Sequence, residues 1–357
     1  MSIAYERSSD GTWGIVSVGG FRLTGRTAVM IAGAALWLLI TVVKTGGGGI
    51  TAIWTSMLLV VELTLLTGLT RSIRTRLIVR AFLIGGFMLT LAIATSMVFQ
   101  VFVSDIYSPI RDVFVPFMEE ALKIAPVLFV LWRWRDARGW SLGATDVLVL
   151  AVACGAGFGL VEDAYIRHAS GWGPTVALLP LTEVNGDRLI AGHAIWTAVA
   201  GGTLGIALLL WGRTARGWLL GSIGPIIAVL THMANNLTAD GQGGLTDAID
   251  KITMKGHLVF WAFILVVLGS IAIDLVVTRS KLPKADELRP PAPGSSLEAL
   301  RARSAFDRER HALAFASFRY DRGSEGARKR SVGILQNLTV SLVQHGSSAT
   351  TGRPPAP

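Results

Sequence analysis

Residues 144–165 read ATDVLVLAVACGAGFGLVEDAY, and the fifteen residues between Asp146 and Glu162 carry no charge. A helix of about 20 apolar residues is long enough to cross the hydrocarbon core of a bilayer. Comparable runs occur throughout the first 280 residues, which predicts an all-α fold, a polytopic transmembrane helical bundle. We expect eight spans, at 27–43, 50–69, 78–103, 113–131, 144–165, 189–211, 217–237 and 256–278.

The composition agrees with a membrane protein. Hydrophobic residues make up 51% of the chain and charged residues only 16%, whereas soluble domains carry about 25% charged residues. The single cysteine, Cys154, lies in an apolar run and excludes a disulfide framework. Of the net charge of +9, +7 lies beyond residue 278, where fourteen Lys or Arg face seven Asp or Glu.

Basic residues between the spans predict the orientation. Cytoplasmic loops of membrane proteins are enriched in Lys and Arg, and alternate loops of this chain are arginine-rich. Eight spans with both termini in the cytoplasm satisfy this rule in every loop. The arginines that carry it are Arg71, Arg74 and Arg76, then Arg133, Arg135 and Arg138, then Arg213 and Arg216, and finally Arg279.

The chain divides into three parts by composition. We expect residues 1–26 to form a cytoplasmic N-terminal segment, residues 27–278 the transmembrane domain, and residues 279–357 a basic, Pro-containing cytoplasmic tail. We expect this tail to be largely disordered, apart from one amphipathic helix at 295–319 on the membrane face or on a partner. Its charge favours contact with anionic lipid or with a protein. Nucleic acid is not expected, because stacking aromatics and the known binding motifs are absent.

Several ionisable side chains lie inside the predicted spans, where each costs about 2.5–3.5 kcal/mol and is therefore expected to be paired or functional. At 1.5 Å of rise per residue, these side chains reach similar depths, roughly 6–9 Å, in the outer half of the bilayer. Their meeting at one level predicts a single site. Its candidate residues are Glu119, Glu120 and Lys123 in the fourth span, Glu162 in the fifth, His193 in the sixth, and His232 and Asn236 in the seventh.

The residue types indicate hydrolysis, which requires an activated water, a base and oxyanion donors. In one mechanism, Glu162, His193 and His232 hold a zinc ion, and Glu119 or Glu120 is a ligand or the general base. In the other, a glutamate activates water directly, His193 assists, and His232 and Asn236 stabilise the oxyanion. Glycines at 155, 157 and 159 allow close helix approach.

A second class of function also places buried Glu and His residues in a membrane, namely an ion- or proton-coupled transporter. Transporters commonly consist of two related halves. Here the charged motifs fall on four consecutive spans and have no counterpart in the first three, which favours the protease.

The motifs resemble one known family. Glu119-Glu120-x-x-Lys123, Phe158-x-x-x-Glu162, His193-x-x-Trp196-Thr197 and His232-x-x-x-Asn236 follow the pattern of the PrsW family of intramembrane proteases over residues 25–278. The family is distantly similar to the CAAX-protease and bacteriocin-processing membrane enzymes.

The resemblance implies a metallopeptidase of the bacterial plasma membrane that cleaves membrane-anchored proteins. It also implies a first-cut protease acting on an anti-sigma factor, on its extracytoplasmic side. The CAAX-type relatives have histidine and arginine where this chain has Glu162 and Lys123. This difference favours the PrsW branch and leaves the choice of water activator open.

Overall fold

We describe the fold of the 357-residue chain from a computed structural model. The structure describes residues 3–6, 15–18, 21–24, 47–102, 109–133, 141–165, 181–184, 188–239, 243–281, 297–319, 325–326 and 328–337. The predicted first span, 27–43, lies outside them.

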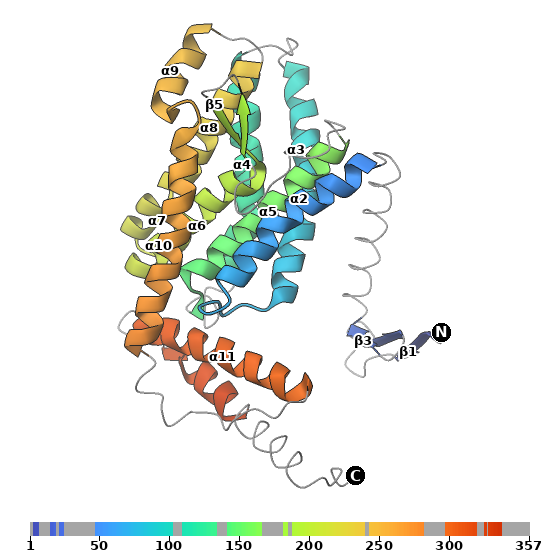
Figure 1. Ribbon diagram of the computed structural model, residues 1–357, viewed down its shortest axis with the longest axis vertical. Coiled ribbons are helices and arrows are strands. Elements are labelled where there is room, and N and C mark those ends of the chain that lie inside the picture. The colour runs from blue at the N-terminus through green and yellow to red at the C-terminus, as the bar shows by residue number, and fades with distance from the viewer. Residues whose placement is uncertain are drawn as a thin grey trace.

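A helical bundle forms the main body of the protein, and α5 (Ala144–Tyr165) lies at its centre (Figure 1). In the candidate span Ala144–Asp163, every residue from 144 to 161 is buried, as expected for a helix that is apolar on every face. The surrounding helices are α2 (Gly47–Leu66), α3 (Thr75–Phe102), α4 (Pro109–Arg133), α6 (His193–Trp211), α7 (Ala215–Gly221), α8 (Ile223–Ala239), α9 (Gly243–Thr253) and α10 (His257–Lys281).

The expectation of eight spans was wrong. Five described segments are long and apolar enough to cross a membrane: Thr75–Phe102, Ala144–Asp163, His193–Trp211, Ala215–Thr238 and Gly244–Lys281. The helix predicted at 50–69 contributes a shorter apolar segment, Ser56–Leu66. The helix predicted at 113–131 is present as α4, but Glu119, Glu120 and Lys123 on its middle turns make it too polar to qualify.

Two short antiparallel sheets accompany the helices and were not predicted. One consists of β1 (Ile3–Glu6), β2 (Ile15–Val18) and β3 (Phe21–Thr24), and the other of β4 (Leu181–Val184) and β5 (Arg188–Ala191). The span predicted from residue 189 therefore begins only at His193, directly after the β4–β5 hairpin. Arg188 forms an ion pair with Asp250 of α9, and Leu189 N–H donates to the Lys255 carbonyl at 2.9 Å.

The opposite end of the bundle is held by two buried aspartates that cap α5. The Asp274 carboxylate accepts hydrogen bonds from Ala144 N–H at 2.9 Å and Thr145 N–H at 2.8 Å. Asp146 accepts from the backbone of Ser72 and Gly143, which ties the α2–α3 turn to the start of α5. Carboxylates at a helix N-terminus satisfy its free N–H groups. These hydrogen bonds explain why two charged residues, Asp146 and Asp274, occur in apolar spans. Their role is structural.

The tail is more ordered than the sequence predicts. Helix α11 (Leu297–Phe318) crosses the end of the bundle opposite α9 (Figure 1), and residues 328–337 are also helical. The predicted helix at 295–319 is therefore present, but it packs on the chain's own bundle. Arg319 Nη1 donates to the Leu142 carbonyl at 2.9 Å, and Phe315 packs with Ala144, Leu209 and Val277.

Phe315→Ala is expected to release α11 from the bundle. The Phe315 side chain is fully buried, and removing a buried phenyl ring costs about 3–5 kcal/mol. Tryptic cleavage within α11 should become faster by about two orders of magnitude or more, because cleavage follows the open population. Phe87→Ala removes an exposed ring of α3 and is the control. Equal cleavage rates in both variants would contradict docking through Phe315.

Candidate active site

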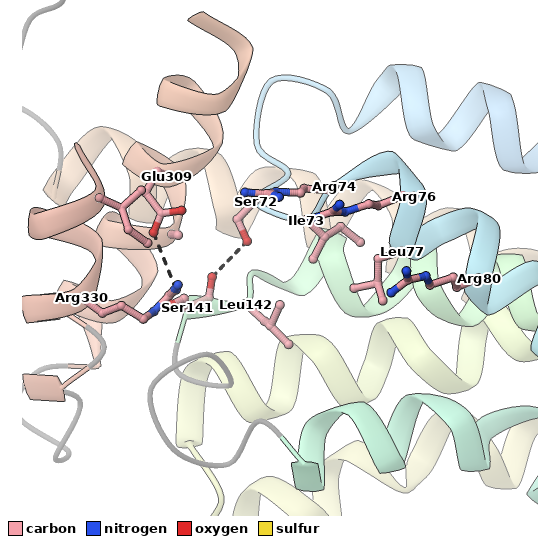
Figure 2. A pocket seen from close by; sticks show the side chains of 12 residues that line it. Ser72, Ile73, Arg74, Arg76, Leu77, Arg80, Ser141, Leu142, Glu309 and Arg330 are labelled. Atoms are coloured by element: carbon pink, nitrogen blue, oxygen red, sulfur yellow. Dashed lines mark hydrogen bonds and ion pairs between the residues drawn. The ribbon is translucent and has the colours of Figure 1, made fainter. Parts of the chain in front are cut away.

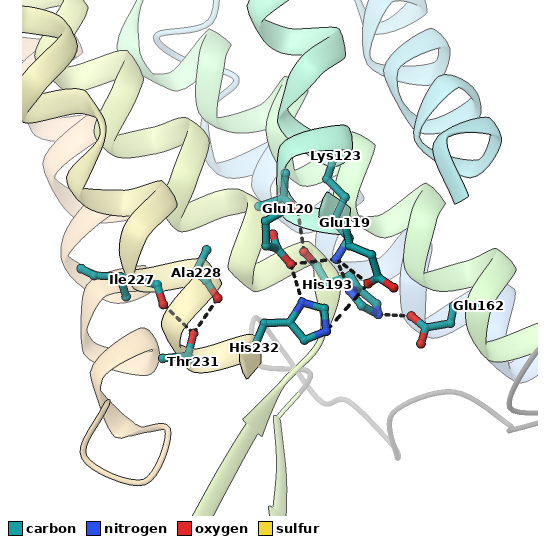
Figure 3. Close-up of polar contacts among 10 residues, drawn as sticks. Glu119, Glu120, Lys123, Glu162, His193, Ile227, Ala228, Thr231 and His232 are labelled. Carbon is teal, nitrogen blue, oxygen red and sulfur yellow. Dashed lines mark hydrogen bonds and ion pairs between the residues drawn. The ribbon is translucent and has the colours of Figure 1, made fainter. Parts of the chain in front are cut away.

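Six ionisable side chains from four helices meet inside the bundle (Figure 3). They are Glu119, Glu120 and Lys123 of α4, Glu162 of α5, His193 at the start of α6, and His232 of α8. Glu120, Lys123, His193 and His232 are buried, and the Glu119 side chain is only 14% exposed. Charges at this depth are stable when paired with one another.

Lys123 lies at the centre of this cluster and is fully buried. Its Nζ donates to Glu120 Oε1 at 2.7 Å and to His193 Nδ1 at 2.5 Å. The distance to Glu119 Oε2, the pairing expected from the spacing of four residues, is longer at 3.6 Å. The ammonium also lies 4.4 Å from the centre of the Phe158 ring, a cation–π contact. One cation therefore neutralises Glu120 and orients His193.

His232 is held by Glu120 on one edge and by Trp196 on one face. His232 Nδ1 lies 2.9 Å from Glu120 Oε1, and a carboxylate accepts the proton at this nitrogen. The Trp196 ring stacks on the imidazole, with centroids 4.1 Å apart and planes 15° apart. With Nδ1 occupied, Nε2 is left as the available nitrogen, and it lies 3.8 Å from Glu119 Oε2.

His193 lies between Lys123 and Glu162. The Lys123 ammonium has no acceptor, so His193 Nδ1 accepts its hydrogen bond and the ring proton resides on Nε2. Nε2 contacts Glu162 Oε2. In both histidines, Nδ1 thus contacts a side chain of α4. Nε2 of His232 faces Glu119, and Nε2 of His193 faces Glu162.

A glycine on α5 permits this arrangement. A Cβ atom at Gly155 would lie 2.5 Å from the His193 carbonyl oxygen and from Thr197 Oγ1. Any side chain there would push the first turn of α6 away from α5. The sequence-based inference that residues 155, 157 and 159 allow close approach is therefore confirmed, since Gly157 and Gly159 also contact neighbouring helices.

The donor atoms of the cluster fit a metal ion. One ligand atom each from Glu119, His193 and His232 lie within 4.8 Å of one another. Glu119 Oε2 is buried and has no hydrogen-bond partner among the described residues. An imidazole whose Nδ1 donates to a carboxylate, as in His232, together with a second carboxylate is typical of zinc sites.

Sequence reasoning did not assign every member of the site. The spacing paired Lys123 with Glu119, and the motifs included Phe158 and Trp196 without indicating a role. In the structure all three contact the histidines. Lys123, Phe158 and Trp196 lie one helical turn from Glu120, Glu162 and His193, respectively. This spacing was the sequence signal that could have indicated their role in the site. Asn236 follows His232 by one turn and is half-buried, and within the described part of the chain it has no hydrogen bond to the cluster.

Comparison with known families shows which class of protein has this arrangement of residues. The family described as PrsW family intramembrane metalloprotease matches residues 74–269, more than half of the chain and all of the cluster. The chain therefore belongs to the PrsW family of intramembrane metalloproteases and is a multi-pass membrane protein. The predicted resemblance is confirmed. Comparisons with curated proteins and with solved structures gave no match.

Proposed function

We propose that the protein is an endopeptidase that hydrolyses peptide bonds of membrane-anchored proteins at the Glu119–His193–His232 cluster, with zinc as its metal. The observation that supports this most directly is the approach of three ligand atoms to within 4.8 Å in a buried site. The contact of His232 Nδ1 with Glu120 leaves Nε2 of that ring for a ligand. His193 can present its Nε2 once the ring proton has moved to Nδ1.

The metal, when bound, supplies a polarised water nucleophile at neutral pH. Glu120 is a positioning residue, since it accepts the His232 Nδ1 proton and fixes the tautomer that presents Nε2. Lys123 balances the Glu120 charge and holds His193. Trp196 covers one face of His232 and excludes water from it.

Glu162 is the proton acceptor in this proposal. Its Oε2 contacts His193 Nε2, so it can take the proton from that nitrogen. Lys123 can supply a proton to Nδ1 at the same time, which keeps the imidazole neutral when Nε2 becomes a ligand. The same carboxylate is in position to accept a proton from an attacking water, since it borders the cluster without belonging to the three closest ligand atoms. Asn236 remains a candidate oxyanion donor one turn from His232.

The setting that fits this chemistry is a bacterial plasma membrane, with both termini and α11 on the cytoplasmic side. The arginine-rich turns at the α11 end support that orientation. The site would then act from the outer half of the bilayer, where a membrane-anchored anti-sigma factor is a suitable substrate for a first cut.

The test compares wild type with His193→Ala and His232→Ala, purified in lipid, on a panel of single-span substrates. We expect about one zinc per wild-type chain, and loss of both zinc and cleavage in each variant. Chelation followed by zinc addition should remove and restore wild-type cleavage. Cleavage by a zinc-free protein would instead support direct glutamate catalysis. Proton-coupled transport that depends on the same histidines would overturn the protease.

A further inference from the structure

An arginine-lined cavity lies at the α11 end of the bundle, far from the candidate active site in the sequence and in the fold (Figure 2). It has a volume of about 300 Å³ and lies between the α2–α3 turn, the start of α5, α11 and the helical residues 328–337. Its charged lining residues are Arg74, Arg76, Arg80, Arg330 and Glu309, a formal charge of +3.

The described residues neutralise the charges in this cavity only in part. Glu309 lies 3.6 Å from Arg330, whereas Arg74, Arg76 and Arg80 form no ion pair within the described residues. The nearby Asp146 carboxylate is occupied by hydrogen bonds from Ser72, Ile73 and Gly143.

Two further arginines add to this positive charge. Burial, together with the charges of Arg74 and Arg71, lowers the pKa of the neighbouring Arg308. Burial also lowers the pKa of Arg71 itself. An anion placed among these guanidinium groups would relieve their mutual repulsion.

A second, apolar cavity continues from the first. It has a volume of about 410 Å³, lies between α3, α4 and α5, and shares Leu77 and Arg80 with the arginine-lined cavity. The other residues that line it are apolar: Ala81, Ile84, Met88, Ala125, Pro126, Val127, Phe129, Val130, Leu150 and Cys154. From Leu77 to Met88 the cavity follows α3 for roughly 16 Å, about half of a ~30 Å hydrocarbon core.

We propose that the two cavities form one binding site for an anionic phospholipid, with its phosphate among the arginines and an acyl chain in the apolar groove. A free phosphate would use the charged cavity alone and would leave the groove beside it unexplained. Arg74 directly precedes the candidate span Thr75–Phe102, and Arg76 and Arg80 lie in its first two turns, near the level at which headgroups meet the hydrocarbon. Long basic side chains extend toward that level.

Such a lipid would also join the tail to the membrane domain. Glu309, Ala312, Arg330 and Ile334 come from α11 and residues 328–337, whereas the groove lies wholly in the bundle. The headgroup therefore contacts both parts. This site is independent of the proposed proteolysis, because none of its lining residues belongs to the catalytic cluster.

The experiment places the full-length protein in phosphatidylcholine vesicles with a trace of spin-labelled phosphatidylglycerol or spin-labelled phosphatidylcholine. Electron spin resonance then measures the fraction of each label that the protein immobilises. Wild type is expected to prefer phosphatidylglycerol. The preference should fall about fivefold for Arg76→Gln or Arg80→Gln and roughly 25-fold for the double variant, given the usual contribution of one basic residue near anionic lipid.

Two matched controls separate the headgroup from the chain. Arg301→Gln removes an exposed arginine of α11 outside the cavity and should keep the preference. Ile84→Trp fills the groove and should reduce binding of labelled phosphatidylglycerol, whereas Ile93→Trp, farther along α3, should not.

Three results would overturn the proposal. The first is equal immobilisation of both lipids by wild type. The second is equal behaviour of a cavity variant and its control, tested on the single variants if the double variant does not fold. The third is displacement of the labelled lipid by inorganic phosphate, which would assign the arginines to a free anion.

Discussion

Glu119→Gln is expected to lower the rate of substrate cleavage by about 10²–10⁴-fold, because it removes the carboxylate proposed as a zinc ligand; loss of a positioned acid–base carboxylate has an effect of the same size. Glu119 Oε2 is buried, has no hydrogen-bond partner in the described part of the chain, and faces His232 Nε2 at 3.8 Å. Glutamine keeps the size of the side chain but removes the anionic oxygen. The measurement is initial cleavage rate in lipid, with zinc content determined on the same preparation.

Glu120→Gln is the matched control, since it makes the same change at the adjacent residue. Glu120 contacts Lys123 and His232 Nδ1, so we expect a smaller loss, about 10–100-fold, as is typical for a residue that orients a metal ligand. Zinc loss in Glu119→Gln identifies this carboxylate as a ligand, whereas inactive protein with full zinc identifies it as a base. A larger defect in Glu120→Gln would reverse the two roles.

The convergence of the site could be inferred from the sequence because charged residues are costly in apolar helices. Glu119, Glu162, His193 and His232 stand out for this reason, and equal depth predicts that they meet. Which carboxylate faces the histidines depends on how α4 is rotated, and that is decided by packing against α6 and α8. The bond from Lys123 to His193 joins residues 70 positions apart and leaves no local signal.

The errors in the fold have similar causes. The prediction counted α4 as a span by its length, although Glu119, Glu120 and Lys123 make it more polar than the five segments that qualify. Composition also made the tail look disordered. Phe306, Leu313 and Phe315 are too few to form a core of their own, but they are buried against residues 328–337 and the bundle.

Lys123→Met is expected to destabilise the protein by about 3–5 kcal/mol, the usual result of removing one partner from a buried ion pair. Lys123 is fully buried, and methionine replaces its volume without its charge. Glu120 would then keep only its contact with His232, and His193 Nδ1 would lose its donor. The measurement is the free energy of unfolding in denaturant titrations of the purified protein.

The double variant Lys123→Met/Glu120→Gln tests whether charge is the cause. Removing both partners takes away the uncompensated carboxylate, so the double variant should be more stable than Lys123→Met alone. If Lys123→Met and the double variant were equally destabilised, the lost stability would be assigned to packing of the lysine side chain against Phe158. Both variants should be inactive, because His193 is oriented through Lys123. A stable and active Lys123→Met would show that the cluster is organised without this cation.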